Sequence, residues 1–160
     1  MIHRRNLLGA TGMLLGLSAG PVLAQEQRAG DIVVSRGWTR AVPNGAPTAA
    51  GYLTLRNEGS APDRLLSAAS PMARSVELHA TSMVDGVARM RPLAAGVPIP
   101  PGETVRLEPG NIHAMLVGPS GSFARGGRVP LVLRFERAGE VAVDLSVEAP
   151  GARTGGHPGH

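Results

Sequence analysis

Two segments near the C-terminus, VPLVLRFE at residues 129–136 and VAVDLSVE at residues 141–148, decide the fold class of this chain. In both segments large apolar side chains recur at every second position, which is the period of a β-strand with one buried face. The sequence RAGE at residues 137–140 forms a turn between them. The two segments are therefore predicted to form an antiparallel hairpin, with one face in the core and the other in water.

Shorter segments of the same kind recur along the rest of the chain. Turns rich in Gly, Pro, Asn and Asp separate them, and no stretch after Gln25 keeps a helical period. Regularly spaced short strands are typical of an antiparallel β-sandwich or β-barrel. We therefore predict an all-β single domain, with further strands at residues 32–35, 52–56, 65–68, 76–83, 87–91, 104–107 and 112–117.

The first 24 residues are predicted to be a signal peptide. Arg4 and Arg5 precede an apolar stretch, and residues 22–24 (VLA) resemble a cleavage site. The alternative is a membrane anchor, but glycines and Pro21 interrupt the apolar stretch, which is short for a membrane span. The adjacent arginines also resemble a twin-arginine export signal. We expect export to the bacterial periplasm, with no stable membrane insertion after cleavage.

The predicted domain occupies residues 25–149, and residues 150–160 are predicted to form a disordered tail rich in glycine. All 16 basic residues are Arg, against 12 acidic residues, and the two signs are interspersed. No basic run could follow a phosphate backbone, so a nucleic-acid partner is not expected.

The 160-residue chain also contains no cysteine. This excludes disulfides, thiolate-bound zinc, iron–sulfur clusters, blue-copper sites and cysteine nucleophiles. No catalytic pattern of Ser, His and Asp is present, and we expect a binding protein rather than an enzyme.

Histidine and methionine are the remaining soft metal ligands. The Asp85-Gly86 dipeptide predicts a two-residue hairpin loop, and that loop places Thr81 opposite Met90. His79 lies two residues before Thr81, so His79 and Met90 are predicted to be diagonal neighbours on one face. Met83 shares this predicted face and is a further candidate ligand.

The second pair of soft ligands is His113 and Met115, which share a strand face. Their neighbours Ile112, Ala114 and Leu116 are apolar and are predicted to face the core, so the pair is predicted to point outward or toward a rim. If the two segments lie close together, two imidazoles and two thioethers converge, a set that suits Cu(I) better than Zn(II), Ca(II) or Mg(II). On spacing alone, core-filling methionines and hydrogen-bonded histidines remain the alternative. Met72 is expected to pack or to be exposed.

The residues that carry these candidates also carry a family resemblance. Over residues 31–147 the chain resembles the PCu(A)C family of periplasmic copper(I) chaperones. The family motif is a His, ten residues, a Met, about twenty-one residues, and then His-x-Met. Here ten residues separate His79 from Met90, 22 separate Met90 from His113, and Met115 completes the motif. Matching segments include WTRA at 38–41, AGYLTL at 50–55, DRLL at 63–66, VELH at 76–79, DGVARMRP at 85–92, IPPG at 99–102, EPGNIHAML at 108–116 and FERAG at 135–139.

This resemblance implies a cupredoxin-like β-barrel that holds one Cu(I) per chain near the surface. It implies His79, Met90, His113 and Met115 as the ligands. Glu77 and Asn111 flank these ligands in the sequence and are candidates for contacts that support them. The resemblance also implies a copper-accepting partner, either a cytochrome oxidase subunit or another assembly chaperone. Two other functions stay open: copper storage or detoxification through the same site, and a metal-independent β-sandwich interaction module. In the tail, His157 and His160 are candidates for a Cu(II) or Ni(II) site.

Overall fold

The structure is a computed structural model that describes residues 26–151. Its eleven strands form one sheet, and no helix occurs in this range, so the predicted all-β fold is confirmed. The strands are β1 (Gln27–Ala29), β2 (Ile32–Arg40), β3 (Thr48–Asn57), β4 (Asp63–Ala69), β5 (Ala73–Val84), β6 (Val87–Pro92), β7 (Val97–Ile99), β8 (Thr104–Leu107), β9 (Ile112–Pro119), β10 (Arg128–Phe135) and β11 (Gly139–Glu148).

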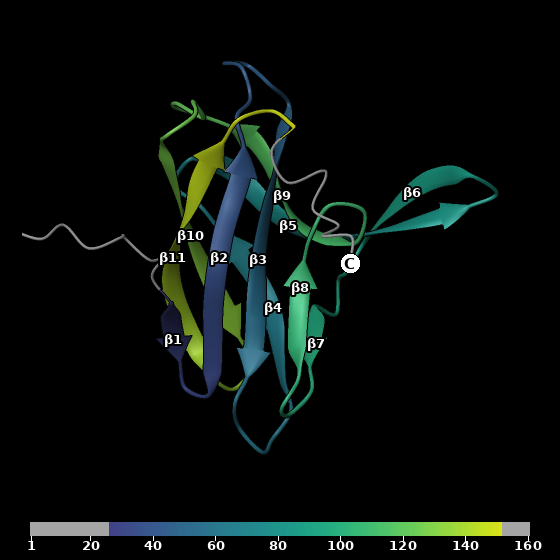
Figure 1. The fold of residues 1–160 in the computed structure, drawn as a ribbon, viewed down its shortest axis with the longest axis vertical. Coiled ribbons are helices and arrows are strands. Elements are labelled where there is room, and N and C mark those ends of the chain that lie inside the picture. Colours follow the sequence, from purple (N-terminus) through teal and green to yellow (C-terminus); the bar gives the residue numbers. More distant parts are fainter. Residues whose placement is uncertain (1–25, 152–160) are drawn as a thin grey trace, which may run out of the picture.

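The sheet follows the order β6-β5-β9-β8-β3-β2-β11-β10-β4-β7, with β1 added beside β2 and a further pairing of β9 with β3. Most neighbours are antiparallel, but β11 with β2 and β8 with β9 run parallel. The sheet is therefore mixed, a detail that side-chain alternation cannot reveal because alternation is the same in both directions. Figure 1 shows the sheet wrapped into a barrel-like body from which the β5–β6 hairpin projects. The end strands β6 and β7 do not pair with each other, so the barrel is not closed.

The core forms on the inner face of this wrapped sheet. The predicted C-terminal hairpin is confirmed as β10 paired with β11, and Leu131, Leu133 and Leu145 on its inner face are fully buried. Leu55, Leu65 and Leu116 contribute from other strands and are equally inaccessible. Aliphatic side chains thus supply most of the packing in a chain with few aromatic residues.

A β-bulge in β2 changes which residues face outward. Ser35 pairs with Thr54, but Trp38 pairs with Tyr52, so β2 carries one extra residue between these pairs. Arg36, within the bulge, has a positive φ of 55°, which is uncommon for a residue other than glycine. The extra residue places Trp38 on the same side of the sheet as Tyr52. Their rings lie 4.6 Å apart between centroids.

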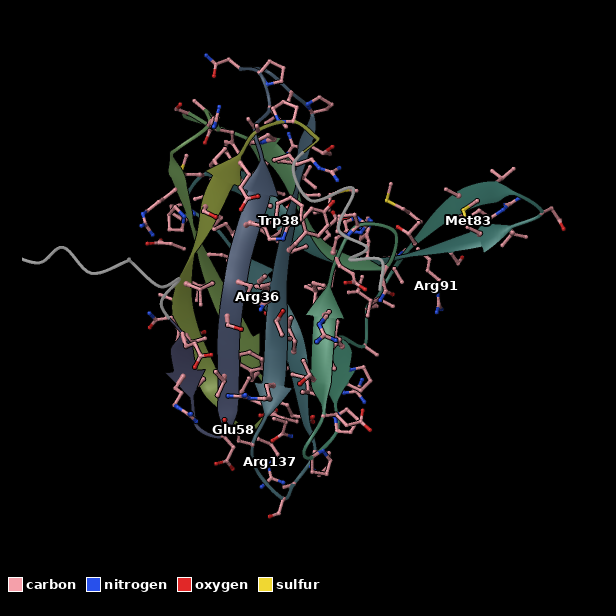
Figure 2. All side chains as sticks on the ribbon, viewed as in Figure 1. Arg36, Trp38, Glu58, Met83, Arg91 and Arg137 are labelled. Carbon is pink, nitrogen blue, oxygen red and sulfur yellow. The ribbon has the colours of Figure 1, made fainter. Side chains whose placement is uncertain are left out.

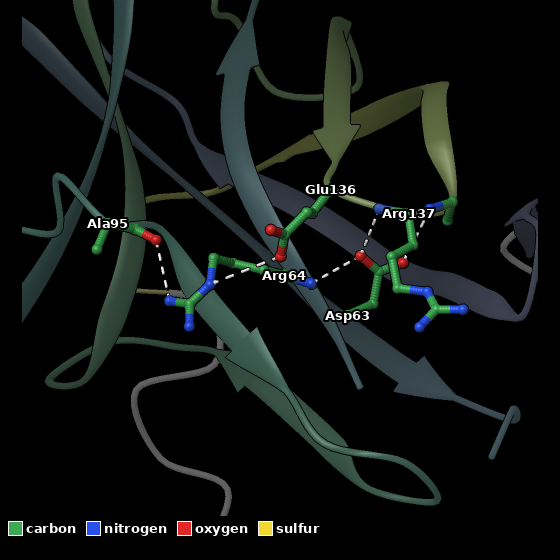
Figure 3. Close-up of polar contacts among 6 residues, drawn as sticks. Asp63, Arg64, Ala95, Glu136 and Arg137 are labelled. Carbon is green, nitrogen blue, oxygen red and sulfur yellow. Dashed lines mark hydrogen bonds and ion pairs between the residues drawn. The ribbon is translucent and has the colours of Figure 1, made fainter. Parts of the chain in front are cut away.

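Buried Asp63 at the start of β4 ties that strand to the turn between β10 and β11 (Figure 3). Its Oδ1 accepts hydrogen bonds from the backbone N–H groups of Arg64, at 2.7 Å, and Arg137, at 2.9 Å. Its Oδ2 accepts one from the N–H of Ala138, also at 2.9 Å. The carboxylate therefore satisfies three backbone donors at one end of the barrel and stabilises the fold there.

Within residues 26–151, no helix has the length and apolar character needed to cross a bilayer. The predicted signal peptide at residues 1–24 lies outside the described residues. Of the predicted tail, only residues 150 and 151 are described, so the disorder expected there and the candidate ligands His157 and His160 also lie outside them.

Candidate metal centre

Strand β5 aligns the two predicted ligand pairs, because it pairs with β6 on one side and with β9 on the other. In the β5–β6 hairpin, Thr81 is opposite Met90, as the Asp85-Gly86 turn predicts. Asp85 and Gly86 both have positive φ, the conformation that a two-residue type I′ turn requires. On the other side, His79 is directly opposite His113. The two segments are therefore adjacent strands.

All four predicted ligands share one face of this three-stranded region. His79 and His113 have ring centroids 5.7 Å apart in an edge-to-face arrangement. Met115 is opposite Glu77, two residues along from the histidine pair, and therefore points to the same side. Met90 lies diagonally across from His79 on β6. Two imidazoles and two thioethers thus line one side of neighbouring strands.

His113 is less accessible than the sequence suggests. The sequence predicts that it points outward or toward a rim, and its side chain does lie on the face of β9 away from the inward-facing Ala114 and Leu116. However, His113 is only 7% exposed. Strand β9 has β5 on one side and β3 and β8 on the other, so its outer face is central in the sheet. Alternation predicts which face a side chain takes, but neighbouring strands determine whether water reaches that face.

A carboxylate orients the imidazole of His79. The Nε2 atom of His79 lies 2.9 Å from Oε2 of Glu77, the residue that sequence analysis had proposed as a hydrogen-bonding neighbour. Because the carboxylate accepts this bond, a neutral His79 carries its proton on Nε2 and has its lone pair on Nδ1. That Nδ1 is buried and has no hydrogen-bond partner among the described residues. A carboxylate on one imidazole nitrogen and a free lone pair on the other is the usual arrangement around a metal-binding histidine.

The environment of His113 also favours a neutral imidazole. Burial lowers its pKa below the usual value of 6.5, and the nearby His79 lowers it further, while a backbone hydrogen bond at Asn111 acts in the opposite direction. A neutral imidazole can donate a nitrogen lone pair without first losing a proton. His113 is therefore suited to bind a cation near neutral pH.

The methionines fall into three environments. Met115 is half-buried on β9, whereas Met90 is 58% exposed and Met83 is 67% exposed on the projecting hairpin. Met72 is partly buried and packs against the hydrophobic core, which is one of the two alternatives predicted for it. A core-filling role therefore accounts for Met72 but not for Met83 or Met90.

An aromatic pair that the candidate ligand set does not include lies on the same side of the sheet. Ala50 of β3 is opposite Met115, so Tyr52, two residues further, shares that side, as does its partner Trp38. The guanidinium of Arg40 lies 5.8 Å from the centroid of the Trp38 ring and 6.0 Å from that of Tyr52. Predicting this group from sequence would require knowing the bulge at Arg36.

The described residues contain no group of three or more His, Cys, Asp or Glu that could hold a metal ion. A metal site on this face would therefore have to use the thioethers. Two imidazoles with two neutral sulfur atoms form a soft donor set, which favours Cu(I) over harder divalent cations.

Comparison with known proteins gives a family and a set of related structures. Residues 32–147 match the family model described as "Putative lipoprotein LpqE-like". The chain is 32% identical over 142 residues to "Putative lipoprotein Lxx21020" from Leifsonia xyli, a match that covers 89% of this chain and 84% of the relative.

Solved structures confirm the resemblance to the PCu(A)C family. The copper-bound PCuAC domain from PmoF2 is 32% identical, with a TM-score of 0.66 over 79% of this chain and 99% of that domain. The apo PCuAC domain from PmoF1 is 27% identical, with a TM-score of 0.67 over 79% of this chain and all of that domain. Cu(I)-loaded DR1885 from Deinococcus radiodurans is 28% identical, with a TM-score of 0.59 over 78% of this chain and 81% of that protein.

Proposed function

This chain belongs to the LpqE-like family, and from that premise we propose that it is an exported copper chaperone that carries one Cu(I) in a site formed by His79, Met90, His113 and Met115. The single observation that carries the proposal is the buried Nδ1 of His79, which lacks a partner among the described residues and lies on the side that the other three share. The structures of copper-bound relatives support the choice of metal.

The imidazoles and the thioethers of the proposed site have different roles in binding and releasing Cu(I). The imidazoles are held in place: His79 by the hydrogen bond that it donates to Glu77, and His113 by burial beneath neighbouring strands. The thioethers are soft and neutral, so they bind Cu(I) without fixing it as strongly as a thiolate would. In an oxidising compartment they also avoid the disulfide formation that would inactivate a pair of cysteines.

Transfer to a partner would occur by stepwise ligand exchange. Met90 is mostly exposed, so a ligand from the acceptor can approach the metal from the side of the hairpin before all four donor bonds break. We propose that the acceptor offers stronger, thiolate-containing ligands and belongs to the assembly of cytochrome oxidase copper centres, as the PCuAC resemblance implies. Storage of copper in the same site would require no such acceptor.

Export is part of the proposal. The relative from Leifsonia xyli bears the name lipoprotein, which supports an exported protein. We propose that residues 1–24 are a signal peptide, in which Arg4 and Arg5 resemble a twin-arginine signal. Residues 25–149 then form the domain that works in the periplasm.

An anaerobic titration of residues 25–160 with Cu(I), in competition with a coloured Cu(I) chelator, tests the proposal. We expect one tightly bound equivalent in the wild type and its loss in a variant carrying Met90→Ala and Met115→Ala. Met72→Leu is the matched control, because Met72 packs against the core instead of the proposed site. Failure of the wild-type protein to compete with the chelator would contradict the proposal and favour the metal-independent interaction module.

Transfer requires a separate measurement. The Cu(I)-loaded protein is mixed with a peptide that contains a Cys-x-x-Cys pair, and the metal content of each is determined after separation. We expect copper to move to the thiolates. Tight binding without any such movement would favour copper storage over a chaperone role.

A further inference from the structure

The β5–β6 hairpin exposes large hydrophobic side chains to solvent. Among the described residues, five large hydrophobic side chains are exposed, and four of them lie in this hairpin: Met83, Val84, Val87 and Met90. All six residues of β6 are exposed. In Figure 2 the labelled Met83 lies on the projecting hairpin, well away from the barrel. Core packing therefore does not explain why this position carries a methionine.

The two thioethers lie on the same face of the hairpin. Met83 is opposite Ala88, and Met90 is opposite Thr81, so Met83 and Met90 are diagonal neighbours across the ladder. Val84 and Val87 are opposite each other and point to the other face. Diagonal positions in an antiparallel pair are about 7–8 Å apart, which long side chains can bridge. Two sulfur atoms can therefore approach a common ion.

This face is also the one that His79 occupies. Thr81 lies midway between His79 and Met83, so Met90, opposite Thr81, is a diagonal neighbour of both. Met83 itself is four residues from His79, or about 13 Å along an extended strand. Met83 cannot join His79 on one ion at that separation, but Met90 can share an ion with either residue.

We infer that Met83 and Met90 form a second, outer Cu(I) station, through which copper passes between the inner site and a partner. This inference rests on the proposed function and assigns Met83 as a ligand outside the inner set. During transfer, the bonds from copper to His79, His113 and Met115 break as a bond to Met83 forms, and Met90 remains bound throughout. Copper stays as Cu(I), so the step needs no oxidant or reductant, and the imidazoles leave as neutral ligands. A thiolate from the acceptor then displaces the weakly held thioethers.

A Met83→Leu variant separates the sulfur from the apolar character of the side chain, since leucine keeps similar size and hydrophobicity. The variant and the wild type are loaded with one Cu(I) and mixed rapidly with an excess of a Cys-x-x-Cys peptide. We expect the equilibrium affinity, from chelator competition, to change by no more than about twofold, because Met83 is not an inner ligand. We expect the transfer rate to fall by about fivefold or more. Met72→Leu, the matched control, should change neither quantity.

Transfer as fast in Met83→Leu as in the wild type would overturn the inference while leaving the inner site intact. That result would assign the exposed hairpin to apolar contact with a partner, for which sulfur is not needed. Loss of tight binding in the wild type would instead contradict the proposed function itself, so the two failures are distinguishable.

A spectroscopic test addresses the outer station directly. Ag(I), a closed-shell substitute for Cu(I), is added to protein with ¹³C-labelled methionine methyl groups, in a variant where His79 and His113 are both replaced by Asn. With the imidazoles removed, we expect the methyl signals of Met83 and Met90 to shift together, and those of Met72 to stay in place. A shift of Met90 without Met83 would overturn the pairing.

Discussion

The two sides of the proposed site differ in how firmly the fold holds them. On the barrel side, His113 is buried between strands and Met115 is half-buried, while the buried Nδ1 of His79 has no partner among the described residues. On the hairpin side, Met90 and Met83 are more than half exposed, and within residues 26–151 no strand pairs with the outer edge of β6. The contrast suggests that a carrier can separate selection of its ion, which needs fixed ligands, from release, which needs accessible ones.

The largest expected effect concerns stability. Leu116→Ala removes a fully buried side chain from β9, next to the ligands, and should lower the free energy of unfolding by about 2–5 kcal/mol. Val87→Ala truncates an exposed side chain on the hairpin and should change it by no more than about 0.5 kcal/mol. Urea unfolding followed by circular dichroism measures both. A similar loss of unfolding free energy in the two variants would mean that the hairpin is packed in solution, and the two sides of the site would then not differ in rigidity.

The dependence of copper affinity on pH should come from the barrel side alone, because imidazoles titrate near neutrality and thioethers do not. A proton and Cu(I) compete for the same nitrogen, so affinity should fall by about tenfold per pH unit for each histidine once the pH is below its pKa. Since burial lowers the pKa of His113, its contribution to this loss should begin at a lower pH than for a free imidazole.

Chelator competition between about pH 7.5 and pH 5 measures this dependence. Met90→Leu should lower the whole affinity curve without changing its slope. A flat profile over this range would indicate that the methionines alone bind copper, and the division between the two sides of the site would then be wrong.

How far the sequence predicts this arrangement depends on the range of the interactions involved. The alignment of His79 with Met90 follows from two adjacent residues, Asp85 and Gly86, because a two-residue loop leaves only one register. The pairing of β5 with β9 is a long-range contact that no local pattern specifies, and only the family motif suggested it. The three-residue strands β1 and β7 were not predicted, because they are too short to show alternation.

Other features depend on three-dimensional context. The bulge at Arg36 requires a positive φ at a residue that rarely adopts it, so the sequence predicted only the first part of β2 and not the outward turn of Trp38. The burial of His113 could not be predicted either, since it depends on the strands that flank β9. The fold class and the shared face of each ligand pair were thus predictable, whereas accessibility was not.

Glu77→Gln tests whether orientation of His79 matters on the barrel side. The amide can still contact Nε2, but it no longer provides a carboxylate that favours the tautomer with a free Nδ1 lone pair. Loss of such a partner commonly costs about 10–100-fold in metal affinity, and because Glu77 is partly exposed we expect the lower end, about tenfold. Chelator competition gives the value, and an unchanged affinity would show that the fold orients His79 without Glu77.

The smallest expected effect is the difference in Cu(I) affinity between variants that lack one or the other of the proposed thioether ligands. Met115→Leu and Met90→Leu each remove one sulfur and preserve the bulk of the side chain. Met115 is already restrained by its surroundings, whereas Met90 must lose side-chain freedom when it binds, at a cost of about 0.5–1.5 kcal/mol. The affinity lost in Met115→Leu should therefore exceed that lost in Met90→Leu by about two- to tenfold. Parallel chelator titrations measure the ratio. A ratio of one would mean that the hairpin holds Met90 as firmly as the barrel holds Met115, and release would then have to begin elsewhere.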